Sequence, residues 1–117
     1  MNREEFKSRS IGTNLVAGVD TIIYTCPTNF TAHVVLMFVC NKGSGNKTIT
    51  AKWYNSHNGA TIYLIGGYVI SAYNFLKMDG SYLTMNAGDS IILTSEAGSD
   101  MDATVTVQEF YDPTRRE

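Results

Sequence analysis

Turn-forming residues divide the chain into short segments from residue 20 to residue 110. Between the turns, β-branched and aromatic residues are frequent and often alternate with polar ones, as in residues 47–55, which is typical of half-buried strands. The short intervals between turns leave little room for a helix. The sequence therefore predicts an all-β fold, an antiparallel β-sandwich of seven to eight strands that is jelly-roll or immunoglobulin-like, with an extended N-terminal arm.

The longest predicted strand, residues 31–41, is apolar on both of its faces. Because side chains alternate along a strand, one face carries Ala32, Val34, Leu36, Phe38 and Cys40, and the other carries His33, Val35, Met37 and Val39. In a two-sheet domain only one face of a strand meets the internal core. We therefore predict that the second set is a contact surface for the arm or for a neighbouring subunit.

Residues 1–18 differ from the rest of the chain in their charges of alternating sign and their sparse apolar residues. Their Ser, Gly and Asn residues discourage a long helix. Two interpretations stay open: a frayed terminus, or an arm that lies on a neighbouring subunit and is anchored by Phe6, Ile11 and Leu15. The expected organisation is an N-terminal arm at 1–18, a β-sandwich domain at 19–111 and a polar C-terminal tail at 112–117.

The charged fraction is low, at 17% against about 25% in typical proteins, which suits a surface covered by neighbours. A net charge of −2 argues against a nucleic-acid partner. No apolar run approaches the roughly 18 residues of a membrane span, so no membrane partner is expected. The N-terminus lacks the apolar core of a signal peptide, so we expect synthesis in a cytoplasm and reduced thiols at Cys26 and Cys40.

Residue types that perform catalysis or bind metals are scattered in the sequence. His33 lies in a predicted strand and His57 in a predicted turn, without the clustered spacing that zinc requires. Neither cysteine stands in a nucleophile motif, so we predict no enzymatic activity, no metal and no other cofactor. Two alternatives stay open: a disulfide between the cysteines, and a calcium site among the loop residues Asp79, Asp89, Asp100 and Asp102.

Tyrosines concentrate in the middle of the chain, at Tyr54, Tyr63, Tyr68, Tyr73 and Tyr82. Tyrosine is enriched at protein interfaces, because its ring is apolar and its hydroxyl is polar. Exposed aromatic rings also suit a carbohydrate-binding platform. We favour the interface and keep the ligand platform as the alternative.

Two stretches of the sequence share a pattern with known proteins. Residues 20–41 contain a strand that ends in Tyr-Thr-Cys-Pro, a short turn, and a long apolar strand that closes on Asn41; residues 86–91 contain Gly-Asp-Ser-Ile. This pattern resembles small virion proteins of tailed bacteriophages, and most closely the structural proteins of marine cyanophages. The resemblance implies a β-sandwich that is attached to a capsid, neck, tail or fibre and has no active site.

These observations predict a bacteriophage virion structural protein, specifically a capsid decoration or cement protein that acts through protein–protein contacts. The expected partners are further copies of the chain, in a homo-oligomer such as a trimer, and other virion proteins such as the major capsid protein. The expected location is the virion, after assembly in the host bacterial cytoplasm. The alternative is a tail, neck or fibre accessory protein, including a receptor- or glycan-binding module.

Overall fold

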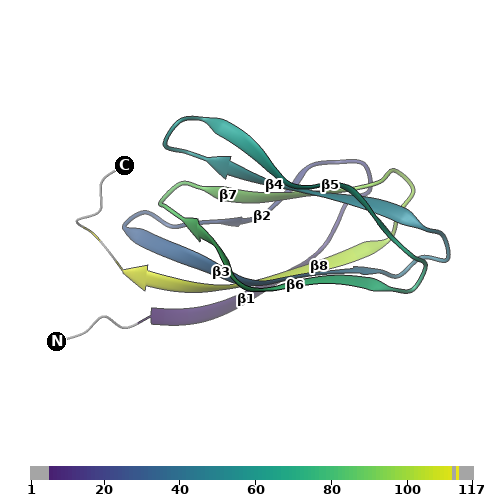
Figure 1. Ribbon diagram of the computed structural model, residues 1–117, viewed down its shortest axis with the longest axis horizontal. Coiled ribbons are helices and arrows are strands. Elements are labelled where there is room, and N and C mark those ends of the chain that lie inside the picture. Colours follow the sequence, from purple (N-terminus) through teal and green to yellow (C-terminus); the bar gives the residue numbers. More distant parts are fainter. Residues whose placement is uncertain (1–5, 112, 114–117) are drawn as a thin grey trace.

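Eight antiparallel strands form two four-stranded sheets that pack face to face in the computed structural model (Figure 1). The structure describes residues 6–111 and 113, and the side chains of all of these except residues 6 and 80–82. The strands are β1 (Phe6–Asn14), β2 (Thr21–Thr25), β3 (Phe30–Asn41), β4 (Lys47–Asn55), β5 (Ala60–Ile70), β6 (Phe75–Met85), β7 (Ser90–Ser95) and β8 (Met101–Tyr111). The described residues contain no helix that could cross a membrane.

The strand order is that of a jelly roll. Sheet A has the order β1-β8-β3-β6 and sheet B has the order β2-β7-β4-β5, so the first and last strands of the chain are neighbours. Only β4 and β5 follow one another within one sheet, and every other connection crosses between the sheets. The predicted antiparallel sandwich is therefore confirmed, and of its two predicted forms the chain adopts the eight-stranded jelly roll.

The core lies between the sheets and follows the alternation in the sequence. In β8, Ala103, Val105 and Val107 are buried, while the polar residues between them are partly exposed. In β4, Ile49 and Ala51 are buried in the same way. Full burial of a medium-sized aliphatic side chain contributes about 1.5–3 kcal/mol relative to exposure. Such burial determines which face of each strand points inward.

A β-bulge in β3 changes part of the predicted face assignment. The pairing of β3 with β8 shifts register between Val34 and Leu36, which leaves Val35 as an extra residue. An extra residue moves all later side chains to the opposite face of the sheet. Met37 and Val39 are therefore only 2% and 1% exposed. They belong to the core and not to the external contact surface predicted for them.

Residues 6–14 form an edge strand of sheet A rather than an arm separate from the sandwich. β1 pairs with β8 along all nine of its residues. Ile11 packs against the core and Leu15 is buried in it, so these two predicted anchors are covered by the chain's own sandwich. The predicted boundary at residue 18 does not separate two structural units within the described residues. The side chain of Phe6, residues 1–5, and the predicted tail except Pro113 lie outside the description.

The Gly-Asp turn before β7 is held by a buried carboxylate. Asp89 is fully buried, and its Oδ1 accepts hydrogen bonds from the backbone N–H of Ser56 (2.9 Å) and from the Ser56 hydroxyl (2.8 Å). Its Oδ2 accepts from Trp53 Nε1 (3.1 Å) and from the backbone N–H of Asn86 (3.0 Å). Gly88 has φ +89°, and a Cβ there would lie 3.1 Å from Ser56 Oγ. The turn therefore requires both residues of the Gly-Asp pair.

Candidate interaction surface

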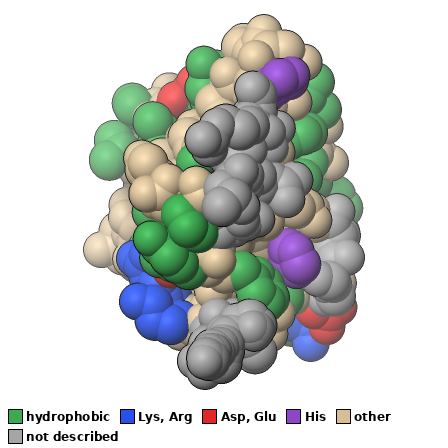
Figure 2. Space-filling view, turned by 90° about the vertical axis from the view of Figure 1, so that its left-hand side faces the viewer, with side chains coloured by type: hydrophobic (Ala, Val, Ile, Leu, Met, Phe, Trp, Pro, Cys, Tyr) green, Lys and Arg blue, Asp and Glu red, His purple; other side chains and the backbone are tan. Residues whose placement is uncertain are grey.

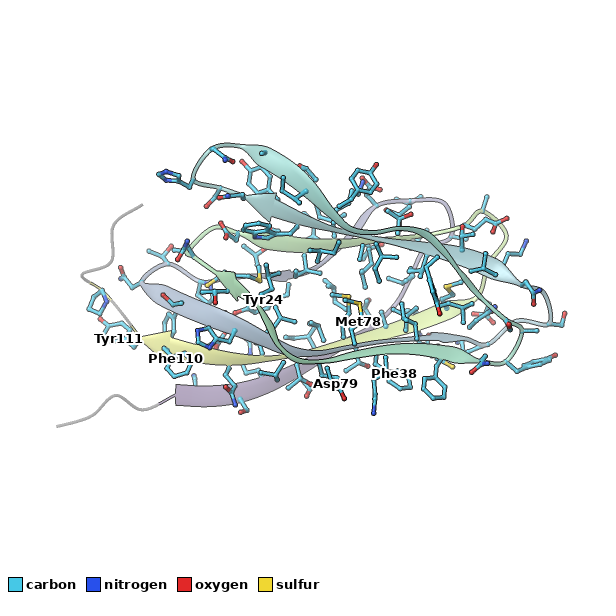
Figure 3. All side chains as sticks on the ribbon, in the orientation of Figure 1. Tyr24, Phe38, Met78, Asp79, Phe110 and Tyr111 are labelled. Atoms are coloured by element: carbon cyan, nitrogen blue, oxygen red, sulfur yellow. The ribbon has the colours of Figure 1, made fainter. Side chains whose placement is uncertain are left out.

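A row of partly exposed apolar side chains crosses the outer face of sheet A. The central strand β3 contributes most of it, and the neighbouring strands β6 and β8 contribute one phenylalanine each. We call this row the sheet A stripe; its members are His33, Val35, Leu36, Phe38, Cys40, Phe75 and Phe110. Figure 3 shows Phe38 on the outer side of sheet A, whereas Tyr24 and Met78 lie between the two sheets. The stripe is therefore external to the core.

Aromatic contacts fix the two ends of the stripe. The rings of Phe38 and Phe75 are stacked, with centroids 5.0 Å apart and planes 13° apart. At the other end, the rings of His33 and Phe110 have centroids 5.0 Å apart and planes 48° apart. Rings held in this way lose little further conformational freedom when a partner binds, which lowers the entropic cost of association.

Polar side chains flank the stripe. Thr104, Thr106 and Gln108 of β8 are partly exposed between the buried residues of that strand. On the other side, Lys77 and Asp79 of β6 form an ion pair with a 3.7 Å separation, and Figure 3 shows Asp79 on the outer side of the sheet. An apolar centre with a polar rim is the usual arrangement of a protein–protein interface.

A charged group marks the end of the same face near the β7–β8 connection. Asn14 donates a hydrogen bond to Asp102, and Lys42 Nζ lies 3.2 Å from the Asp102 carboxylate and 3.4 Å from that of Asp100. The Asn14 hydrogen bond, and then Lys42, lower the pKa of Asp102. The two carboxylates raise the pKa of Lys42. Asp102 and Lys42 therefore remain charged at neutral pH and contribute a hydrophilic boundary to the face.

Two of the four β3 residues that were predicted to form an external contact surface belong to the sheet A stripe. His33 and Val35 are partly exposed members of it, while Met37 and Val39 are core residues. The sequence assigned Leu36 and Phe38 to the inner face, and it did not single out Phe75 or Phe110. The informative signal was that residues 31–41 are apolar on both faces; the assignment of the faces failed at the bulge.

The five tyrosines do not form one surface. Cross-strand pairing places Tyr54 and Tyr63 on the outer face of sheet B. Tyr68 pairs with a β4 residue that is buried in the core, and cross-strand partners share a face, so Tyr68 belongs to the inner face. Tyr73 lies in the β5–β6 connection, where its backbone N–H donates to Gly43 O (3.2 Å). The side chain of Tyr82 lies outside the described residues. A coplanar platform of the predicted set is therefore not formed by the described side chains.

A buried carboxylate links β1, β2 and β8. Glu109 is 3% exposed, and its Oε2 accepts a hydrogen bond from the Tyr24 hydroxyl (2.6 Å) and lies 2.9 Å from Arg9 Nη1. Burial, together with the bond to Glu109, raises the pKa of Tyr24.

Burial also raises the pKa of the nearby Cys26 thiol to about 11, so this thiol is protonated at neutral pH and is a poor nucleophile. Both Cys26 and Cys40 are free, so the alternative disulfide is not formed.

The described residues contain no group of three or more His, Cys, Asp or Glu side chains that could hold a metal ion. Figure 2 shows histidine side chains at two separate places on one end of the molecule. Of the four aspartates in the alternative calcium site, Asp89 already accepts hydrogen bonds from protein donors with both carboxylate oxygens. The surface best formed among the described residues is therefore the sheet A stripe.

Comparison with known proteins identifies a shared fold. No model of a protein family and no curated protein matches the sequence. A protein of the Bacillus endospore appendages, described as a family of disulfide-linked pili, is 12% identical with a TM-score of 0.57, over 95% of this chain and 92% of that chain. A chain of the Gx strain of infectious bursal disease virus is 8% identical with a TM-score of 0.59, over 98% of this chain and 35% of that chain.

A third similar structure is the VP2 subviral particle of infectious bursal disease virus, which is 8% identical with a TM-score of 0.56. This chain spans about a third of that viral chain, because the match covers 96% of this chain and 34% of the other. Similarity at such low identity shows the fold alone. The chain thus has a β-sandwich of a kind also found in subunits of pili and of virus particles.

Proposed function

We propose that the chain is a structural component of a virion and acts through protein–protein contacts. The observation that carries this proposal is the sheet A stripe, a fixed apolar row with a polar rim on the outside of a complete sandwich. Subunits of known virus particles share the fold. Fold similarity does not define function by itself, so the proposal depends on the stripe.

The specific role that we propose is decoration of a bacteriophage capsid. The stripe would be buried against the major capsid protein or against further copies of the chain. Each 100 Å² of apolar surface buried contributes about 2.5 kcal/mol before the costs of ordering. Repeated copies on a particle would add to one another through avidity. We propose assembly in the host bacterial cytoplasm and residence in the virion, without nucleic acid, membrane, cofactor or enzymatic activity.

The direct test is binding to particles of the virus whose genome carries the sequence. Phe38→Asp and Phe75→Asp each place a charge in the stripe, so we expect both variants to lose cosedimentation with capsids. Tyr73→Asp is the matched control, because Tyr73 is an exposed aromatic residue outside the stripe. Circular dichroism checks that all three variants fold. Wild-type binding by both stripe variants, or absence of the protein from purified virions by mass spectrometry, would contradict the proposal.

A second candidate function is a receptor- or glycan-binding module of a tail, neck or fibre. It is supported by Tyr54 and Tyr63 on the outer face of sheet B and by Lys52 Nζ, which lies 5.7 Å from the centroid of the Tyr63 ring. A glycan array followed by titration tests it. Saturable binding that Tyr63→Ala abolishes and Tyr73→Ala retains would favour this candidate over decoration.

A further inference from the structure

Among the described residues, one edge of sheet B is formed by a strand with exposed apolar side chains. β5 is the last strand of this sheet, beside β4, and Figure 1 shows the first part of it along the upper rim of the described structure. Of the ten large hydrophobic residues that are exposed among the described side chains, four lie on β5: Ile62 (44% exposed), Tyr63 (64%), Tyr68 (51%) and Val69 (56%). The backbone N–H and C=O groups at such an edge are available to another strand.

The other three edge strands carry features that oppose pairing. β1 contains Lys7 and Arg9, and β6 contains Lys77 and Asp79. β2 has only five residues and a register shift. β5 has eleven residues and contains neither a charged residue nor a proline. Charges, prolines and short lengths are the usual protection of edge strands, so β5 has the least chemical protection of the four.

Register shifts limit pairing to one part of β5. The pairing with β4 is irregular opposite Ile49–Lys52, where Gly67 has φ +67°. Bulges of this kind twist an edge away from a partner strand. The run Ala60–Tyr63 pairs regularly with β4, and three of its four residues are exposed. This run is the part of the edge that can continue a regular sheet.

We propose that the run Ala60–Tyr63 pairs in antiparallel orientation with the same run of a second copy of the chain, in the register that places Thr61 opposite its own copy at the two-fold axis. The two B sheets would then form one continuous eight-stranded sheet. In a two-fold contact, residues near the axis face their own copies, and like charges in that position are destabilising. The absence of charge from β5 therefore favours a second copy as the partner. This contact does not involve the sheet A stripe, and it does not rest on the proposed decoration function.

Charge substitutions at Thr61 test this contact. Thr61 is exposed and pairs with Tyr54, which lies on the outer face of sheet B. A longer side chain at this position therefore points away from the core and leaves it intact. In sedimentation velocity over a concentration series, we expect the wild type to dimerise. Thr61→Lys and Thr61→Glu should each weaken dimerisation by about tenfold or more, because like charges meet at the axis. An equimolar mixture of the two variants should restore the dimer.

Two controls separate this contact from others. Thr28→Lys adds the same charge to an exposed turn and should dimerise like the wild type, as should Phe38→Asp in the stripe. Hydrogen exchange of the wild type should slow in residues 60–63 as concentration rises, and should not slow in Thr61→Lys. A wild type that remains monomeric at high concentration, or Thr61 variants that dimerise like the wild type, would overturn the proposal.

Discussion

Arg9 of β1 and Glu109 of β8 form an ion pair, with Arg9 Nη1 2.9 Å from Glu109 Oε2. The Glu109 side chain is buried, whereas that of Arg9 is 46% exposed. The Tyr24 hydroxyl adds a hydrogen bond from β2 on the opposite sheet. A charge in the N-terminal segment therefore compensates a carboxylate at the edge of the core, which makes this segment part of the sandwich.

Arg9→Met should destabilise the fold, because it leaves Glu109 buried with Tyr24 as its remaining partner among those described above. Breaking a fully buried ion pair costs about 3–5 kcal/mol. We expect a smaller loss, about 1–3 kcal/mol, because water screens the half-exposed guanidinium. Urea denaturation measures the change. Lys7→Met is the control, since Lys7 is exposed on the same strand; equal stability of the two variants would contradict the role of the pair.

Deletion of residues 1–16 should prevent stable folding. The deletion removes β1, exposes the edge of β8, and removes Leu15 from the core, where its N–H donates to Met101 O (2.9 Å). The measurement is thermal unfolding by circular dichroism, and a synthetic peptide of residues 1–16 should restore the cooperative transition. A truncated chain that unfolds like the full chain would instead support a separable arm.

The sequence predicts some strands well because their alternation is uninterrupted. In β4 and β8, apolar residues alternate with polar ones, and both strands form as expected. In β3, residues 34–37 are all apolar, so the alternation of residue types does not reveal the extra residue of the bulge. In β1, polar residues suit an exposed edge strand as well as an arm, and its partner β8 lies almost the whole chain away.

The candidate site was predicted only in part for the same reason. The excess of apolar residues in 31–41 indicated an external surface, and the structure contains one. The contributions of Phe75 and Phe110 depend on which strands lie beside β3, and this order is set by packing across the whole chain. Residues close in sequence also need not share a surface: Tyr63 and Tyr68 lie on one strand but on opposite faces, because they are an odd number of residues apart and the two register shifts between them cancel.

Asp89→Asn should destabilise the protein strongly although it preserves shape. Each carboxylate oxygen of Asp89 accepts two hydrogen bonds from protein donors. An amide nitrogen cannot accept, so two buried donors lose their acceptor in either orientation of the asparagine. We expect a loss of about 2–4 kcal/mol in the free energy of unfolding.

Denaturant titration followed by the fluorescence of Trp53 reports this change directly, because Trp53 Nε1 donates to Asp89. Asp100→Asn is the matched control, since Asp100 is exposed and its ion pair with Lys42 lies on the surface. Exposed pairs contribute about 0–1 kcal/mol. Similar losses for both substitutions would show that the buried hydrogen bonds of Asp89 are not what stabilises the turn.

Stability should decrease in alkaline solution because of Cys26. Burial, together with the negative charges of Glu109 and Asp89, raises the pKa of its thiol from 9.0 to about 11 in the folded protein. Between these two values the unfolded chain releases the proton while the folded chain retains it, so the unfolded state gains relative stability as pH rises. The contribution is fully present below pH 9 and is lost by about pH 11. The raised pKa of Tyr24 acts in the same direction at higher pH.

Denaturation by urea at several pH values from 8 to 10 in wild type and Cys26→Ala separates this contribution. The substitution changes the absolute stability, because it removes a buried sulfur, so the slope of the unfolding free energy with pH is the informative quantity. We expect the wild type to lose stability across this range and Cys26→Ala to lose less. Equal slopes would mean that Cys26 ionises alike in the folded and unfolded chain, which is incompatible with a thiol buried beside Glu109.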